Sequence, residues 1–312
     1  MDIPPFAAEH ARRRLERLAF QVNSTTRSPV PEAVHELRVA IRRSIQALTV
    51  FKACFPRRET KRVRKELKEI LTAAGAVRDC DIAAKVLSKI QPPGSAALAQ
   101  QFRTDRKVKE KSLIALLKRW AARKSISKWC NGLELGAPRP FPGTVESLAR
   151  RMLRGIGKEF FKSGGQAAAA GNSGEHLHDF RILAKKFRYT LELFSPACPS
   201  ALDNQIGRIK EIQSLLGAIN DYQTVRNMVA ASREQPRLEA ELKKSQNQRT
   251  RKFRKLWTGE FSGPGLAKQW VADFDAVMQP SRKPVTRSRR ATASAAVAAK
   301  APIAAAAGVN PR

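Results

Sequence analysis

The sequence predicts an all-α fold made of duplicated helical bundles related by pseudo-two-fold symmetry, followed by a disordered C-terminal tail. No segment shows the alternating apolar and polar pattern of a β-strand. Apolar residues instead recur at the spacing of helical turns, as at Val34, Leu37 and Ile41. The order of motifs then repeats at an offset of 142 to 143 residues. That period is too long for a solenoid and indicates duplication of a whole helical unit.

This repeat defines the expected domain organisation. Residues 1–135 form the first helical-bundle repeat and residues 144–280 the second. Residues 136–143 form a linker, because three prolines and two glycines in eight residues disfavour a helix. Residues 281–312 contain no aromatic residue and are rich in Ala, Pro, Ser and Arg. We expect a disordered basic tail there, since such a segment buries too little apolar surface to offset its chain entropy.

In the first repeat, prolines and glycines mark the expected helix ends. Pro31 suits the first turn of a helix, and Pro56 ends that helix. Gly75 predicts a break, after which Asp79 has the character of an N-cap. We therefore expect helices over residues 7–22, 31–54, 58–74, 79–90 and 96–123, a loop over 23–30 and a short helix around Trp129.

The second repeat follows the same order. Residues 149–153 resemble part of the first helix, and the Gly- and Ala-rich residues 163–174 predict a flexible loop. The helix that begins near His178 reaches Phe194, and a last helix spans residues 236–257.

The composition is strongly basic. The chain of 312 residues has 59 Lys and Arg against 27 Asp and Glu, which gives a formal net charge of +32. Seven of these cations and no acid follow Ser281, so +25 remains on the first 280 residues. The excess charge is therefore a property of the folded part, and such a field attracts polyanions.

Other features place the protein in the cytoplasm. The four cysteines form no CxxC pair, which is typical of free thiols in a reducing compartment. No run of about 18 apolar residues occurs, so we expect no membrane partner. The N-terminus lacks the basic and then apolar pattern of a signal peptide.

One motif occurs twice. His35 is followed by Arg38 and then by the adjacent pair Arg42 and Arg43, and His178 is followed by Arg181, Lys185 and Lys186 at the same spacing. On a helix, the histidine and the next two cations of each copy fall within a sector of about 60°, beside an apolar stripe. A solvated basic face is the alternative interpretation. We favour an anion site, because a solvated face has no need to repeat a histidine beside the same acid-free row of cations.

The sequence resembles the CHAD (conserved histidine α-helical domain) family over residues 5 to about 280. Four segments in matching order carry the resemblance: His35-x-x-Arg38-Val39-x-x-Arg42-Arg43, Val77-Arg78-Asp79-x-Asp81, His178-x-x-Arg181-x-x-x-Lys185-Lys186-x-Arg188-Tyr189, and Leu216-Gly217-x-x-Asn220-Asp221. The resemblance implies two helical bundles with internal symmetry that bind inorganic polyphosphate. It also implies polyphosphate granules as a location. Nothing in the chain resembles the triphosphate-processing domain to which some relatives are fused.

The expected polyphosphate-binding residues are the two motif rows and the lysines of the adjacent helices: His35, Arg38, Arg42, Arg43, Lys68, His178, Arg181, Lys185, Lys186, Arg188 and Lys210. Arg suits this role because its guanidinium holds two phosphate oxygens, and Lys supplies a compact charge. Where the family usually has a further Arg, the first repeat has Ile45, whereas the second has Arg188. We therefore expect the first repeat to hold its anion less firmly.

The roles of the histidines and aspartates are less sharply defined by the sequence. His35 and His178 either donate to the ligand or lie between helices and hold the aspartate that follows Gly75 or Gly217. We expect Asp79 and Asp221 to cap helices or to orient the arginine row rather than to act as catalytic acids.

The sequence favours a binding protein over an enzyme. Phosphoryl transfer needs clustered carboxylates that hold a metal, or a GxxxxGK[ST] loop, and neither pattern occurs. His176 and His178 lack a nearby third ligand, so we expect no metal and no cofactor. The alternative partner is nucleic acid, for which the charge and the basic tail are suitable. Against it stand the low aromatic content of 6% and the lack of a base-reading motif.

Overall fold

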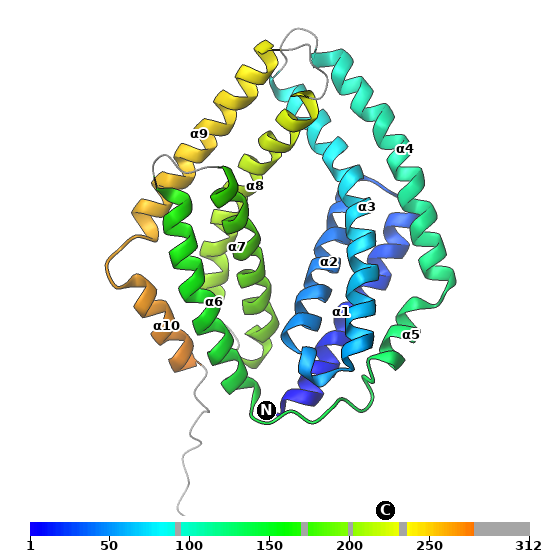
Figure 1. Ribbon diagram of the computed structural model, residues 1–312, viewed down its shortest axis with the longest axis vertical. Coiled ribbons are helices and arrows are strands. Elements are labelled where there is room, and N and C mark those ends of the chain that lie inside the picture. The colour runs from blue at the N-terminus through cyan, green and yellow to red at the C-terminus, as the bar shows by residue number, and fades with distance from the viewer. Residues whose placement is uncertain (91–94, 170–173, 199–201, 231–235, 278–312) are drawn as a thin grey trace, which may run out of the picture. The chain divides into compact units, whose positions relative to one another are not determined.

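The computed structural model describes residues 1–90, 95–169, 174–198, 202–230 and 236–277, and these residues confirm the all-α prediction. The described chain contains ten α-helices and no strand, with one isolated bridge between Asp2 and Thr144. The expected tail at 281–312 lies outside the described residues. The helices (Figure 1) are α1 Ile3–Arg27, α2 Pro31–Val50, α3 Arg57–Ile90, α4 Ser95–Ala122, α5 Ser125–Gly132, α6 Val145–Ala168, α7 Gly174–Phe194, α8 Asp203–Ala230, α9 Pro236–Glu260 and α10 Leu266–Val277.

The helices pack in two matching series. Helix α1 contacts α2, α2 contacts α3 and α3 contacts α4, and the same succession joins α6, α7, α8 and α9. The two series meet where α2 packs against α7 and α3 against α8. Residues 136–143 contain no helix, and residues 1–279 form one compact unit. The division into two repeats around a linker and the pseudo-two-fold axis stay predictions. We use first repeat and second repeat only as names for the series α1–α4 and the series α6–α9.

The expected helix break at Gly75 is wrong. Helix α3 continues through Gly75 for 34 residues, so Asp79 lies inside the helix and is no N-cap. Likewise α8 continues through Gly217, and Asp221 is interior. A helical glycine costs only about 1 kcal/mol relative to alanine, and the packing of a long helix on both of its neighbours exceeds that cost.

The expected flexible loop at residues 163–174 is also wrong for its described part. Helix α6 runs through Gly164 and Gly165 to Ala168, and α7 begins at Gly174. A Cβ atom at Gly164 would lie 2.0 Å from the ring of Trp257, so glycine is required there for close packing of α9 on α6. Tertiary packing thus overrides the local signal that a Gly-Gly pair supplies.

Other helix limits differ from expectation. Helix α1 extends to Arg27, although residues 23–30 were expected to form a loop. The last expected helix reaches Glu260, and a separate helix α10, which the sequence pattern did not indicate, follows a turn in which Gly265 has φ +80°.

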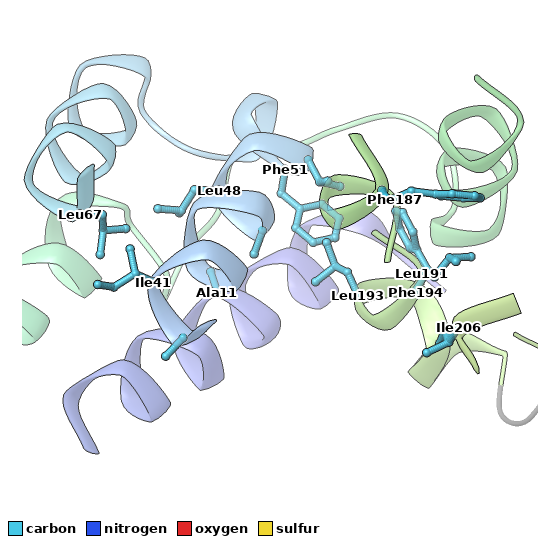
Figure 2. Close-up of a cluster of buried hydrophobic side chains, with 14 of the residues drawn as sticks. Ala11, Ile41, Leu48, Phe51, Leu67, Phe187, Leu191, Leu193, Phe194 and Ile206 are labelled. Carbon is cyan, nitrogen blue, oxygen red and sulfur yellow. The ribbon is translucent and has the colours of Figure 1, made fainter. Parts of the chain in front are cut away.

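Two apolar clusters join the series of helices. The larger one spans both series at the end of α2 and α7, where the rings of Phe51 and Phe194 meet edge to face at 6.1 Å. Figure 2 shows Phe51 beside Leu193 within this cluster. The smaller cluster joins the far ends of α3, α4, α8 and α9. On α3, Val77 belongs to the larger cluster and Ala83 to the smaller one. The helical turn over residues 78–82 therefore lies between the two apolar clusters.

None of the helices in the described part of the chain is both long and apolar enough to cross a membrane.

Candidate anion-binding site

Cations from both repeats converge on one place. Arg38 and Arg42 lie one turn apart on α2, and Arg181 and Lys185 lie one turn apart on α7, which packs against α2. Burial, followed by the charge of Arg42, lowers the pKa of Arg181. Burial, followed by repulsion from Arg42 and Arg181, lowers the pKa of Arg38 to about 10. The two pairs are therefore close enough to repel one another across the contact between the repeats.

Arg78 of α3 completes this group. Its positive charge acts on Arg38, on His35 and on Asp221 of α8, so its guanidinium reaches the second repeat as well. We call Arg38, Arg42, Arg78, Arg181 and Lys185 the cationic cluster. Its members come from α2, α3 and α7, and the α3 residue Arg78 lies between Val77 of the larger apolar cluster and Ala83 of the smaller one.

Most members of the cationic cluster have no direct partner. Among the residues that the structure describes, the side chains of Arg42, Arg78, Arg181 and Lys185 form no hydrogen bond and no ion pair. The Nε of Arg181 is buried without an acceptor. Buried donors without acceptors are costly in a folded protein. Such a group of donors is suited to an external anion that supplies several oxygens.

Lys185 shows the electrostatic strain most strongly. Burial, followed by the charges of Arg181, Arg42 and Arg38, lowers the pKa of Lys185 to about 6. The carboxylate of Asp221 acts in the opposite direction and does not offset these effects. A bound polyanion would reverse the balance, since negative charge favours the ammonium form.

Two carboxylates accompany the cluster. Burial raises the pKa of Asp79, while Arg38 and Lys109 of α4 are the strongest cations acting in the opposite direction. Burial also raises the pKa of Asp221, against the effects of Arg181, Arg78 and Lys185. Each aspartate thus lies among cations from both repeats, and a role in orienting the arginine row stays a prediction. Two carboxylates among five cations of the cluster leave the site positive.

Gly75 has a specific role in positioning Arg38. The Nη1 atom of Arg38 donates to the carbonyl oxygen of Leu71 at 3.0 Å. A Cβ atom at Gly75 would lie 2.7 Å from the same Nη1 atom, so a larger residue there would displace the end of the Arg38 side chain from this position. Gly217, at the equivalent position of the second repeat, has open space around a Cβ. The guanidinium of Arg38 is therefore hydrogen-bonded to α3 of its own repeat, whereas Arg181 forms no equivalent hydrogen bond in the described structure.

Both motif histidines lie on the rim of the cluster rather than inside it. His35 and His178 are exposed, which rules out the interior structural role considered for them. Partial burial and then the charge of Arg78 lower the pKa of His35. His178 lines a cavity together with Arg181. Both histidines are thus within reach of an anion that occupies the cluster.

Arg43 and Arg188 belong to a different arrangement. The Nε of Arg43 donates to Glu192 Oε2 at 3.0 Å, and Arg188 pairs with the other carboxylate oxygen. Arg188 also donates from Nε to Gln213 Oε1 at 2.7 Å. The Tyr189 ring lies under both guanidinium groups, 5.9 Å from Arg43 and 4.7 Å from Arg188. We call Arg43, Arg188 and Glu192 the Glu192 clamp. It links α2, α7 and α8, and a role in anion binding stays a prediction for its two arginines.

Of the expected lysines, Lys185 belongs to the cationic cluster, whereas Lys68, Lys186 and Lys210 are exposed and lie outside it. Lys68 and Lys210 are exposed on α3 and α8, each seven residues and thus two turns before the glycine of its repeat, on the same helix face. Lys186 lines a surface hollow between α6 and α7 together with Glu159 and Asp179. Their participation in binding stays a prediction.

The structure adds two cations that were not among the expected binding residues. Arg78 would have been found if α3 had been extended through Gly75, because residues 75 and 78 then share one helix face. Lys109, whose ammonium also lies 3.3 Å from Cys80 Sγ, has no such signal, since its helix carries many similar lysines.

No group of three or more His, Cys, Asp or Glu residues in the described ranges has the geometry to hold a metal ion.

Comparisons with known proteins agree with this architecture. Residues 9–230 match the family model of the CHAD domain. The fold is similar to the crystal structure of the CHAD domain from the plant Ricinus communis, with a TM-score of 0.60 and 18% identity over 88% of this chain and 92% of that one. It is also similar to PptA from Streptomyces chartreusis, with a TM-score of 0.56 and 15% identity over 90% of this chain and 100% of that one. No curated protein matches the sequence.

Proposed function

The chain belongs to the CHAD domain family, and from this premise we propose that it binds inorganic polyphosphate at the cationic cluster without chemical turnover. The observation that carries the proposal is the set of four cations from α2, α3 and α7 that have no protein partner in the described structure. The family's association with polyphosphate supports the choice of ligand. Binding of this kind would bring the protein to polyphosphate granules.

The chemistry of the ligand suits the site. Polyphosphate is a flexible chain of closely spaced negative charges, with no base to stack and no groove edge to read. Arg42 and Arg181 present planar donors, and Lys185, on which both of their charges act, adds an ammonium group once a polyanion favours its protonated form. Because the cations repel one another in the free protein, neutralising them favours the complex more than a pairing at the outer surface would.

The decisive experiment is calorimetric titration with long-chain polyphosphate. We expect the double variant Arg42→Gln/Arg181→Gln to bind at least about 100-fold more weakly, since a hydrogen bond to a charged group contributes about 1.5–3 kcal/mol. The matched control is Lys118→Gln/Arg119→Gln, which removes two exposed cations of α4 and leaves the same net charge. Equal losses in both double variants would reduce the binding to a general effect of charge and contradict the proposal.

Two further measurements distinguish the alternatives. If duplex DNA or RNA displaces polyphosphate at equal charge concentration, a nucleic-acid function is favoured instead. Phosphate release from polyphosphate in the presence of Mg²⁺ or Mn²⁺ would contradict binding without turnover. The affinity should also fall steeply with salt concentration, as counterion release requires for a polyanion.

A further inference from the structure

Two cavities border the cationic cluster at equivalent places in the two repeats. One contacts the cluster through Arg78, and the other through Arg181. Their walls correspond at offsets of 142 to 143 residues: Pro31 and Gly174 line one cavity each, as do Arg78 and Asn220, and Asp81 and Gln223.

The two cavities differ in chemistry. The first has a volume of about 680 Å³ and is lined by charges of both signs: the cations Arg78, Lys85, Arg103 and Arg106 and the acids Glu32, Asp81 and Glu110. The second has a volume of about 300 Å³, and the amides of Asn220 and Gln223 replace the charges of the first. We call it the amide cavity. In the first cavity Arg106 is already paired with Asp81 and Glu110. The amide cavity, in contrast, has no acid among its described lining residues and, apart from Arg181 and His178, presents only amides and apolar groups, which suits an uncharged group.

The floor of the amide cavity is apolar. Leu177 and Leu216 are buried core residues, and Ile219 lies on the next turn of α8. A mostly apolar lining with a few fixed polar groups is typical of sites for small organic ligands, which begin at about 300 Å³. The cavity thus has the size and lining for one flat ring system.

The amides are held in place by a hydrogen-bonded chain. Arg226 Nη1 donates to Gln246 Oε1 at 2.9 Å, Gln246 Nε2 donates to Gln223 Oε1 at 3.0 Å, and Gln223 Nε2 donates to Asn227 Oδ1 at 2.7 Å. Asn220 Nδ2 donates to Thr224 Oγ1 at 3.3 Å. Each amide still has unused hydrogen-bonding capacity, because its nitrogen carries two hydrogens and its oxygen two lone pairs. Fixed donors and acceptors of this kind can form hydrogen bonds with the ring nitrogens and exocyclic groups at the edge of a heterocycle.

Arg181 connects this cavity to the anion site. It lines the amide cavity with His178, while its charge acts on Arg38 and Asp79 of the first repeat. A ligand with its ring in the cavity would therefore have its phosphates beside Arg181 and within the cluster.

From this arrangement we infer that the amide cavity, together with the cationic cluster, is a binding site for nucleoside polyphosphates. The heterocycle lies on Leu216 and Ile219 with its edge toward Asn220 and Gln223, and the phosphates extend past Arg181 into the cluster. The inference rests on the proposed function, since the phosphates use the same cations, and it predicts competition between nucleotides and polyphosphate.

The test compares ATP and GTP with inorganic tripolyphosphate by calorimetry on the full chain in metal-free buffer. Tripolyphosphate is at least as negatively charged, so charge alone favours it. We expect the better-bound nucleotide to bind at least about tenfold more tightly than tripolyphosphate. Equal or tighter binding of tripolyphosphate would overturn the inference, even if long-chain polyphosphate binds well. Binding of no phosphate compound at all would contradict the proposed function itself.

A single substitution tests whether the preference for the nucleotide arises in the amide cavity. Asn220→Leu removes the amide at nearly constant volume and should reduce the preference for the nucleotide over tripolyphosphate to less than threefold, with binding of long-chain polyphosphate unchanged. Asn247→Leu alters an exposed asparagine of α9 and should keep the preference. A preference that persists in Asn220→Leu would place the heterocycle elsewhere and overturn the inference.

Discussion

Arg42 and Arg43 are adjacent in the sequence and belong to two different regions of the molecule. Arg42 lies in the cationic cluster without a partner among the described residues, whereas Arg43 is bound to Glu192 in the clamp. Arg181 and Arg188 of α7 also fall in different regions, but they share one helix face and are separated by two turns along the helix. Successive positions on a helix point in directions that differ by about 100°. Arg42 therefore lies among other cations, while the next residue, Arg43, lies against a carboxylate.

The comparison teaches how to distinguish binding from structural cations in a very basic protein. In the clamp, Arg43 of α2 is paired with Glu192 of α7 and so stabilises the contact between the repeats, while Arg188 pairs with the same carboxylate from within α7. The cations of the cluster repel one another in the free protein, and this repulsion makes them suited to an anion. Net charge cannot distinguish the two regions, but the position of a carboxylate can.

The largest effect on stability is expected from removing the carboxylate of the clamp. Glu192→Ala leaves Arg43 and Arg188 unpaired with only 32% and 14% of their side chains exposed. We expect a loss of about 2–3 kcal/mol in the free energy of unfolding, somewhat below the range for fully buried pairs. Urea unfolding measures it.

The control for this variant is Glu9→Ala, which breaks a pair with Arg13 whose side chains are 67% and 57% exposed. That change should cost less than about 0.5 kcal/mol. Equal losses in the two variants would remove the distinction between the clamp and ordinary surface pairs.

Adjacent arginines give the next test. Arg42→Gln should weaken polyphosphate binding about tenfold or more, or about 1.4 kcal/mol, and leave stability unchanged or raised, since it removes a repelling charge. Arg43→Gln should do the reverse, with stability reduced and affinity changed less than threefold. Calorimetry and urea unfolding on both variants measure the two quantities. A similar loss of affinity in both would return Arg43 to the binding site.

The pH dependence of binding should come from the cluster and not from the clamp. The pKa of Lys185 is lowered to about 6 in the free protein, and a bound polyanion raises it. Binding then takes up a proton above pH 6, so affinity for long-chain polyphosphate should rise by up to about tenfold per unit as pH falls from 8 toward 6. Below pH 6 the contribution of Lys185 becomes constant.

Lys185→Met is the variant that isolates this contribution. The measurement is the difference in slope between wild type and Lys185→Met, because the contributions of all other titrating groups cancel in that difference. In the free protein, the lowered pKa means that the unfolded chain binds the proton more tightly, so Lys185 opposes folding most below pH 6 and progressively less as pH rises to about 10.5. Identical slopes in both proteins would show that Lys185 keeps its proton throughout.

The smallest effects concern the two equivalent glycines. Gly217→Ala meets open space and should stabilise the protein by about 0.4–1 kcal/mol. Gly75→Ala should give no such gain, because its Cβ displaces Arg38, and should weaken polyphosphate binding about threefold. Thermal unfolding and calorimetry on both variants test this pair. A gain of stability in Gly75→Ala with full affinity would mean that Arg38 moves freely.

The sequence by itself determined the helical class, most helix positions and which cations share a helix face, because these depend on a period of 3.6 residues along one segment. It therefore placed Arg38 with Arg42, and Arg181 with Lys185. Local signals failed at Gly75 and Gly164, where a small cost in helix propensity is exceeded by packing against Arg38 and Trp257.

Only the tertiary structure decided which of those cations are compensated. The pair of Glu192 with Arg188, one helical turn away, follows from local spacing. Glu192 lies 149 residues from Arg43, however, and Asp221 lies 40 residues from Arg181, so no local pattern brings these groups together. Through-space proximity of α2, α3, α7 and α8 brought Arg78 into the cluster and placed Arg43 and Arg188 in the clamp. Coulomb energies depend on distance in space and on burial, and neither quantity is encoded by spacing along the chain.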